Sequence, residues 1–247
     1  MTIHSYKGGQ GKTTLAVNLA YQLAQERDKR VLLVETDFNM ASFFDVFPAI
    51  SPTHYLNDYF KDSTELRFKE VITSLPERSG VNLIFTSPDF SSDDPVFGMD
   101  RKWYQEKFKE MVRGLSQVAN DYDVAIFDTP PGSNFTAINN LVLSDMAILV
   151  LRPTRYAVSG TVKLIERIYK KTKSSLATFL IWNQIPRVPL KDALVEWEKE
   201  FDKHSIDTIA RIPCSCNIAF DMAMGVVDFT KDPIFSEQLD KIVEKIL

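Results

Sequence analysis

A glycine-rich segment near the N-terminus carries a lysine and two threonines, a combination that binds phosphate groups. The segment reads Lys7-Gly8-Gly9-Gln10-Gly11-Lys12-Thr13-Thr14. Glycines let backbone N–H groups converge on phosphate oxygens, and a helix beginning here adds the positive end of its dipole. Lys12 would neutralise the β- and γ-phosphates, and the Thr13 hydroxyl would bind Mg²⁺. The pattern G-x-x-x-x-G-K-[ST] also asks for a glycine where this sequence has Tyr6.

Carboxylates follow two apolar runs further along the chain. The run 31–34 is followed by Glu35 and Asp37, and the run 124–127 by Asp128 and then Pro130-Pro131-Gly132. An acidic residue at the end of a buried strand, combined with a phosphate loop, indicates a magnesium site, so we expect Asp128 to hold the metal. If the strand continues, Glu35 and Asp37 lie on one side of it. A pair of surface carboxylates at a strand end is the alternative for these two.

These residues must be positioned by strands that end at one edge of a sheet. Short apolar runs alternate with amphipathic stretches, and several runs are apolar throughout, as in strands covered on both faces. We therefore expect an α/β fold, a doubly wound, mostly parallel sheet flanked by helices, as a single domain over residues 1–247. The expected strands are Thr2–Tyr6, Arg30–Glu35, Val81–Thr86, Val124–Phe127, Met146–Leu151, Leu176–Trp182 and Thr208–Ile212. The expected helices are Thr13–Glu26, Arg101–Asn120, Thr136–Leu143, Ala157–Lys173, Lys191–Lys203 and Phe235–Leu247, whereas 38–75 and 87–100 stay unassigned.

The phosphate loop closely resembles that of the ParA/MinD family of deviant P-loop ATPases in the SIMIBI class. The resemblance implies a Mg²⁺-dependent ATPase that forms an ATP sandwich dimer and hydrolyses ATP slowly until an unidentified partner protein stimulates it. It implies that Lys7 reaches the partner's nucleotide and that Asp37 positions the attacking water. Glu35 stands where the family usually has aspartate, and we expect it near the metal. Asn183 and Pro213 match positions near the adenine, and a turn-capping role is the alternative for Asn183. The expected nucleotide-binding residues are Gly8, Gly9, Gln10, Gly11, Lys12, Thr13, Thr14, Asn183 and Pro213.

A nucleotide-driven dimer also needs a surface on which to act. The expected helix 157–173 carries a basic stripe of Lys163, Arg167, Lys170 and Lys171, which two protomers would present to the phosphates of non-specific DNA. A solvated helix exterior is the alternative for this stripe. The C-terminal helix has an apolar stripe but an acidic polar face, and anionic lipid repels such a face, so we do not expect membrane binding.

Composition limits the remaining functions. The 247 residues include 29 Lys and Arg against 33 Asp and Glu, giving a net charge of -4, so no overall positive field holds nucleic acid. With only 2 Cys and no leader segment visible, we expect a cytoplasmic protein. Cys214 and Cys216 raise the alternative of an ATP-dependent iron–sulfur or metal cluster carrier, although we expect buried, inert thiols. A membrane-associated MinD-like regulator and a module that scarcely hydrolyses ATP are further alternatives. The three histidines are scattered, and the sequence assigns them no role.

Overall fold

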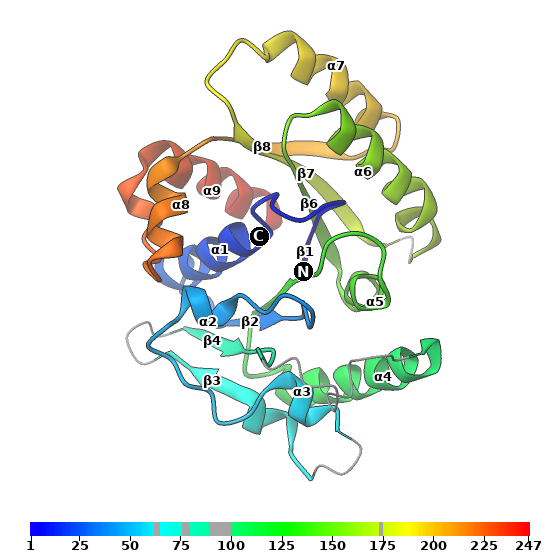
Figure 1. Cartoon of the computed structure of the whole chain (residues 1–247), viewed down its shortest axis with the longest axis vertical. Coiled ribbons are helices and arrows are strands. Elements are labelled where there is room, and N and C mark those ends of the chain that lie inside the picture. The colour runs from blue at the N-terminus through cyan, green and yellow to red at the C-terminus, as the bar shows by residue number, and fades with distance from the viewer. Residues whose placement is uncertain (62–64, 76–79, 89–99, 173–174) are drawn as a thin grey trace.

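The structure is a computed structural model that describes residues 1–61, 65–75, 80–88, 100–172 and 175–247 (Figure 1). Within these residues the sheet has eight strands, in the order β3-β4-β2-β5-β1-β6-β7-β8. All neighbouring pairs are parallel except β3 with β4. The mostly parallel α/β sheet expected from the sequence is therefore confirmed. The strands are β1 (Thr2–His4), β2 (Val31–Glu35), β3 (Ile72–Ser74), β4 (Val81–Ile84), β5 (Val124–Asp128), β6 (Met146–Leu151), β7 (Ala177–Ile185) and β8 (Asp207–Pro213).

Helices cover both faces of the sheet because successive side chains of its buried strands point in opposite directions. On one face, Val31, Leu33, Ile148 and Val150 pack with α1 (Lys12–Arg27), α2 (Phe43–Val46), α8 (Cys216–Ala223) and α9 (Pro233–Ile246). On the other face, Leu32 and Val34 pack with α3 (Leu56–Tyr59) and α4 (Arg101–Val118). The same face continues with α5 (Phe135–Leu143), α6 (Arg155–Arg167) and α7 (Lys191–Asp202), which cover β6 and β7.

Several boundaries differ from those that the sequence predicts. The expected helix 157–173 ends at Arg167 with Ile168 as its C-cap, and a short 3₁₀ turn, η2 (Tyr169–Lys171), follows. Strand β7 runs past Trp182 to Ile185 through a register shift, so that Asn183 lies inside it. The unassigned stretch 38–75 contains α2, α3, β3 and a second 3₁₀ turn, η1 (Phe68–Val71). A third, η3 (Phe229–Lys231), and α8 were also not expected. Most of the unassigned stretch 87–100, namely 89–99, and the end of the predicted 157–173 helix lie outside the described residues.

The topology brings the predicted site residues to one edge. Strand β1 is central, between β5 and β6, and its carboxyl end leads directly into the glycine-rich loop and α1. Glu35 at the end of β2 stands in register with Asp128 at the end of β5. The ends of β7 and β8 reach the same edge two and three strands away from β1. Ligands of open α/β sheets bind at this edge.

Candidate nucleotide-binding site

The glycine-rich loop presents the uncapped N-terminus of α1. Gly9 and Gly11 have φ of 70° and 86°, in the left-handed region that L side chains rarely adopt. Gly11 is the N-cap of α1, and no side chain accepts a hydrogen bond from the first turn. The free N–H groups and the helix dipole therefore favour an anion at this position.

Lys12, Thr13 and Asp128 form a polar cluster at the start of α1, in which Lys12 and Asp128 are buried and Thr13 is partly exposed. The Thr13 hydroxyl donates to Asp128 Oδ2 at 2.6 Å. Lys12 is 8% exposed and Asp128 is 3% exposed. Burial lowers the pKa of Lys12, against the attraction of Asp128 and Asp37. Burial likewise raises the pKa of Asp128 to about 6, although Lys12 and Thr13 both oppose the rise.

This cluster fits a magnesium ion. Asp128 Oδ1 is buried and accepts no hydrogen bond from any described residue. Leaving a buried carboxylate oxygen unpaired is costly, and a hard cation would relieve that cost. A carboxylate and a hydroxyl are oxygen donors of the type that Mg²⁺ prefers. Thr13 and Asp128 are thus suited to hold the metal, as the sequence predicts.

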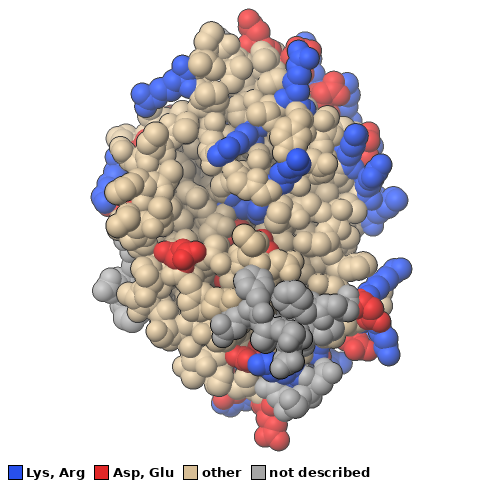
Figure 2. Space-filling model, in the orientation of Figure 1, with Lys and Arg blue, Asp and Glu red and all other residues tan. Residues whose placement is uncertain are grey.

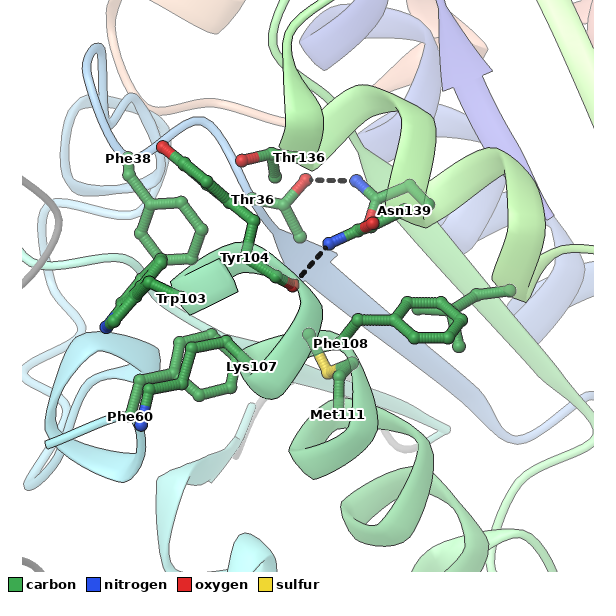
Figure 3. Close-up of a pocket in the computed structure, with 12 residues that line it drawn as sticks. Thr36, Phe38, Phe60, Trp103, Tyr104, Lys107, Phe108, Met111, Thr136 and Asn139 are labelled. Atoms are coloured by element: carbon green, nitrogen blue, oxygen red, sulfur yellow. Dashed lines mark hydrogen bonds between the residues drawn. The ribbon is translucent and has the colours of Figure 1, made fainter. Parts of the chain in front are cut away.

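Asp37 lies beside this cluster at the start of the loop after β2. Burial raises the pKa of Asp37, while Lys12 and the backbone N–H groups of Asn39 and Met40 lower it. Phe38 lines an aromatic pocket between α3, α4 and α5 (Figure 3). Its ring lies 6.1 Å from the ring of Phe60, measured between centroids. The Phe38 contact therefore fixes one end of the segment that carries Asp37. This pocket has a volume of only about 30 Å³, so it has no room for a nucleotide.

Glu35 is held by backbone N–H groups. Its Oε1 accepts from the amides of Ser42 and Phe43, and its Oε2 accepts from the amide of Thr86 at 3.0 Å. The side chain is fully buried, and burial raises its pKa to about 7 against these hydrogen bonds. Glu35 therefore joins β2 to α2 and to the end of β4. Its expected contact with the metal stays a prediction, because its observed partners are these loop groups.

Asn183 and Gln10 hold the phosphate loop in place. Asn183 Nδ2 donates to the Gln10 carbonyl at 2.8 Å, and the Gln10 side chain accepts from the amide of Arg152 at 2.7 Å. Gly11 must lack a side chain here, because a Cβ would lie 2.3 Å from Asn183 Nδ2. Asn183 Oδ1 accepts from the amide of Gln184. The bulge in β7 thus turns Asn183 onto the loop.

A pocket of about 170 Å³ lies beside this contact, at the ends of β7 and β8. It joins Asn183 and Pro213, which the sequence predicts near the base, to Thr14 in α1. It also includes Arg152 and Gln184, which sequence reasoning did not select. The position of Arg152 directly after the β6 strand could have indicated it. The pocket is lined by Thr14, Arg152, Asn183, Gln184, Ile212, Pro213, Cys214, Ser215, Ile218, Ala219 and Phe235.

Lys7 points out of this site. Its side chain is exposed, and its Nζ lies 4.1 Å from the centre of the Tyr156 ring, which α6 presents to solvent. A cation over an exposed aromatic face gains only about 0.5–1 kcal/mol, so Lys7 is easily released from Tyr156. Tyr6, which replaces the first glycine of the loop pattern, packs against Gly160, where a Cβ would lie 2.1 Å from its ring.

The basic stripe is exposed but is not one continuous helix face. Lys163 and Arg167 belong to α6, whereas Lys170 and Lys171 lie on η2. All four side chains are exposed. Figure 2 shows basic side chains gathered along the flank where Figure 1 places α6. The four residues, called the basic surface below, remain a candidate for contact with phosphates.

The membrane and cluster alternatives concern α9 and the two cysteines. The apolar stripe of α9 is buried in the core, including Leu239 and Ile242. No helix in the described ranges combines the length and the apolar character needed to span a bilayer. Cys214 and Cys216 are exposed, so the expectation of buried thiols is wrong; both flank the short turn before α8. No group of three metal-ligating side chains occurs in the part of the chain that is described.

The raised pKa of Asp128 predicts that the protein without metal loses stability as the pH rises. The folded protein binds this proton more tightly than the unfolded chain, whose carboxyl pKa is 3.8. The stabilisation is present below pH 4 and is lost as the pH rises through about 6. Asp128 alone lowers the free energy of unfolding by about 1 kcal/mol between pH 5 and 7.5, and Glu35 adds a decrease of the same sign.

Urea unfolding in EDTA at a series of pH values measures this decrease. Asp128→Asn should remove the part of this decrease that ionisation of Asp128 causes. The control is Asp123→Asn, because Arg30 holds the pKa of the exposed Asp123 well below its usual range, and Asp123 is therefore ionised throughout. Because His4, whose pKa burial lowers to about 4, contributes with the opposite sign, the test is the difference between the two proteins. A change of stability with pH that is equal in wild type and Asp128→Asn contradicts the assignment.

Comparison with known proteins identifies the family. Residues 1–181 match the model of a family described as an AAA domain. The chain is 29% identical over 162 residues to a virulence plasmid ParA family protein of Chlamydia psittaci, covering 66% of this chain and 60% of the relative. It is 31% identical over 176 residues to the chromosome partitioning protein ParA of Myxococcus xanthus, covering 67% of this chain and 56% of the relative. The match thus spans less than two thirds of the length of these relatives.

Solved structures show the same fold. The septum site-determining protein MinD of Pyrococcus horikoshii, solved with Mg-ADP, superposes with a TM-score of 0.75 at 21% identity. The superposition covers 99% of this chain and 94% of MinD. The phosphate loop at the end of the central strand, the acidic residues on the neighbouring strands and the family match agree with one another. The chain belongs to the ParA/MinD family of P-loop ATPases.

Proposed function

We propose that residues 1–247 form one Mg²⁺-dependent ATPase domain that dimerises with ATP and positions DNA or a protein assembly in the cytoplasm. One observation carries the proposal, namely the cluster of buried Lys12 and Asp128 with Thr13 at the uncapped start of α1. A cation, a hydroxyl and an ionisable carboxylate beside free N–H groups match the charges and oxygens of a metal-bound triphosphate. The Mg-ADP in the MinD structure supports the same ligand for this fold.

Each residue has a distinct role in the proposed reaction. The backbone of residues 8–14 binds the phosphates, and Lys12 neutralises the β- and γ-oxygens. Thr13 and Asp128 would hold Mg²⁺, which supplies charge neutralisation at the transferring group when it is bound. Asp37 accepts a hydrogen bond from the attacking water and orients it. The pocket at Asn183 and Pro213 receives the base.

Lys7 would act on the nucleotide of the other protomer. It is exposed and rests on Tyr156 instead of its own phosphate site, so it is free to reach a second chain. A cation supplied in trans stabilises transition-state charge only when the dimer has formed. Hydrolysis by the isolated protein would then be slow, and a partner protein would stimulate it.

The choice between DNA and a protein assembly is tested by binding to random duplex DNA. We expect tight binding with ATP and Mg²⁺, weak binding with ADP and Mg²⁺, and a strong dependence on salt. The double variant Lys170→Ala/Lys171→Ala should weaken binding and flatten the slope of log affinity against log salt by about 2 per protomer. The control is Lys109→Ala/Lys199→Ala, which removes two exposed lysines from α4 and α7.

Binding that is absent or equal in both nucleotide states contradicts DNA as the surface and favours a protein assembly. ATP-dependent binding that persists unchanged in the Lys170/Lys171 variant contradicts the basic surface as the contact. Cluster carriage stays the alternative function because Cys214 and Cys216 are exposed beside the base pocket.

A further inference from the structure

His4 is buried between the turn that follows Asp128 and the turn that carries half of the basic surface. It ends β1, and its side chain is fully buried. Its Nε2 lies 2.7 Å from the carbonyl oxygen of Gly132, and its Nδ1 lies 2.8 Å from the hydroxyl of Tyr169. The His4 and Tyr169 rings also stack, with 5.9 Å between centroids and 14° between planes. One side chain thus joins three segments that are distant in the sequence.

The direction of these hydrogen bonds follows from the groups involved. A carbonyl oxygen only accepts, so Nε2 carries the proton and donates to Gly132. Burial lowers the pKa of His4 to about 4, so the ring is neutral near pH 7, and its unprotonated Nδ1 accepts from the Tyr169 hydroxyl. Each group has one defined role, and loss of either hydrogen bond leaves a buried polar atom without its partner.

Gly132, the first partner of His4, belongs to the nucleotide site. Gly132 lies four residues after Asp128, and Pro130 and Pro131 restrict the backbone between them. The Gly132 amide donates to the Ser5 carbonyl at 2.9 Å, just before the phosphate loop. With a φ of 84°, Gly132 holds a turn that few other residues adopt. A shift of Asp128 or of the phosphate loop therefore acts on the Gly132 carbonyl.

Tyr169, the second partner of His4, belongs to the turn that carries part of the basic surface. Tyr169 is 8% exposed and anchors η2, whereas the next two residues, Lys170 and Lys171, are exposed. The helix α6 ends at Arg167, so this turn is a separate short element. Its own backbone contacts include the amides of Lys171 and Thr172, which donate to the Ile168 carbonyl. A change at the Tyr169 hydroxyl acts directly on the turn that presents Lys170 and Lys171.

We propose that His4 and Tyr169 are positioning residues that couple the nucleotide site to the basic surface, through the hydrogen-bonded chain Tyr169–His4–Gly132. This inference rests on the proposed function, because it assigns a regulation to the same site. Nucleotide binding changes the position of the 130–132 turn, His4 passes the change to Tyr169, and η2 alters the presentation of Lys170 and Lys171. The coupling is reciprocal, so a polyanion bound at the basic surface also changes the affinity for nucleotide.

Amide hydrogen exchange of the full chain tests the coupling without any DNA. After nucleotide binding has been verified by titration, exchange in the segment 168–172 is compared with ATP and Mg²⁺ and without nucleotide. We expect a nucleotide-dependent change of about fivefold in the exchange rate, the factor that one net hydrogen bond contributes. Tyr169→Phe removes the hydroxyl and keeps the ring, so it should abolish this change while ATP affinity and unstimulated hydrolysis remain.

Tyr122→Phe is the matched control, because it removes a half-buried tyrosine hydroxyl that accepts from Asn82 far from the 130–132 turn. It should keep the nucleotide-dependent change. The coupling is overturned if wild type shows no such change in 168–172, or if Tyr169→Phe keeps it in full. In DNA binding, Tyr169→Phe should lower the ratio of ATP-state to ADP-state affinity about fivefold. Failure of wild type to bind DNA would contradict the DNA function, whereas the exchange result would still decide the coupling.

Discussion

Lys12→Ala should abolish measurable ATP binding. Lys12 is a buried cation that faces Asp128 and Asp37 at the uncapped start of α1. Alanine removes the positive charge that balances the phosphates. It also leaves the negative charges of Asp128 and Asp37 beside the phosphates without a neutralising cation. Charge-assisted hydrogen bonds contribute about 1.5–3 kcal/mol each, so the loss of two predicts an affinity at least ~100-fold lower.

Isothermal titration with ATP and Mg²⁺ measures the loss, and circular dichroism verifies that the variant is folded. Lys109→Ala is the control, because it removes an exposed lysine of α4 that lies outside the site. Lys12→Ala should also raise the pKa of Asp128 further, since Lys12 is the main group that lowers it. An ATP affinity near the original value would show that the phosphate loop is not the nucleotide site.

Lys7→Ala should leave ATP binding within about twofold and lower turnover about 10³-fold, the lower end of the effect of a cation supplied in trans. Lys7 rests on the exposed Tyr156 ring, away from the phosphate site of its own protomer. Its removal therefore spares the protomer's own phosphate contacts. The ATP-dependent dimer, followed by light scattering, should also weaken, because Lys7 no longer contacts the nucleotide of the other protomer.

A mixing experiment separates action in trans from action in cis. Asp37→Ala keeps Lys7 but lacks the carboxylate that orients water, so it is inactive by itself. In a mixed dimer, the site on the Lys7→Ala protomer has its own Asp37 and receives Lys7 from its partner. Random mixing in equal amounts should restore about a quarter of wild-type turnover. An unchanged dimer with normal turnover in Lys7→Ala would contradict the sandwich mechanism.

The sequence by itself determined the sheet and the edge at which the site lies. Buried parallel strands are apolar runs, and Asp128 and Glu35 end two such runs, so the carboxylates could be placed without coordinates. The loop could be predicted for a similar local reason. Glycines 9 and 11 do adopt left-handed φ, and the order of strand, glycines, lysine and helix requires no distant partner.

Other features of the site were decided only by the tertiary structure, because they depend on contacts between residues that are distant in the sequence. Glu35 is directed toward the amides of Ser42 and Thr86, which come from the start of α2 and from the segment just after β4. Asn183 reaches the phosphate loop because β7 is bulged, and no periodicity indicates a bulge. Strand β3 reads Ile-Thr-Ser, so it has no apolar run by which to identify it.

His4 shows the same limit most clearly. A single histidine in an apolar strand has no spacing that indicates a role, and the sequence assigns it none. Its two partners, Gly132 and Tyr169, are 128 and 165 residues away along the chain. Local pattern therefore determines which elements form and which end of each strand carries the chemistry. The hydrogen bonds that connect those elements are set by packing, because they depend on which distant groups the fold brings within about 3 Å.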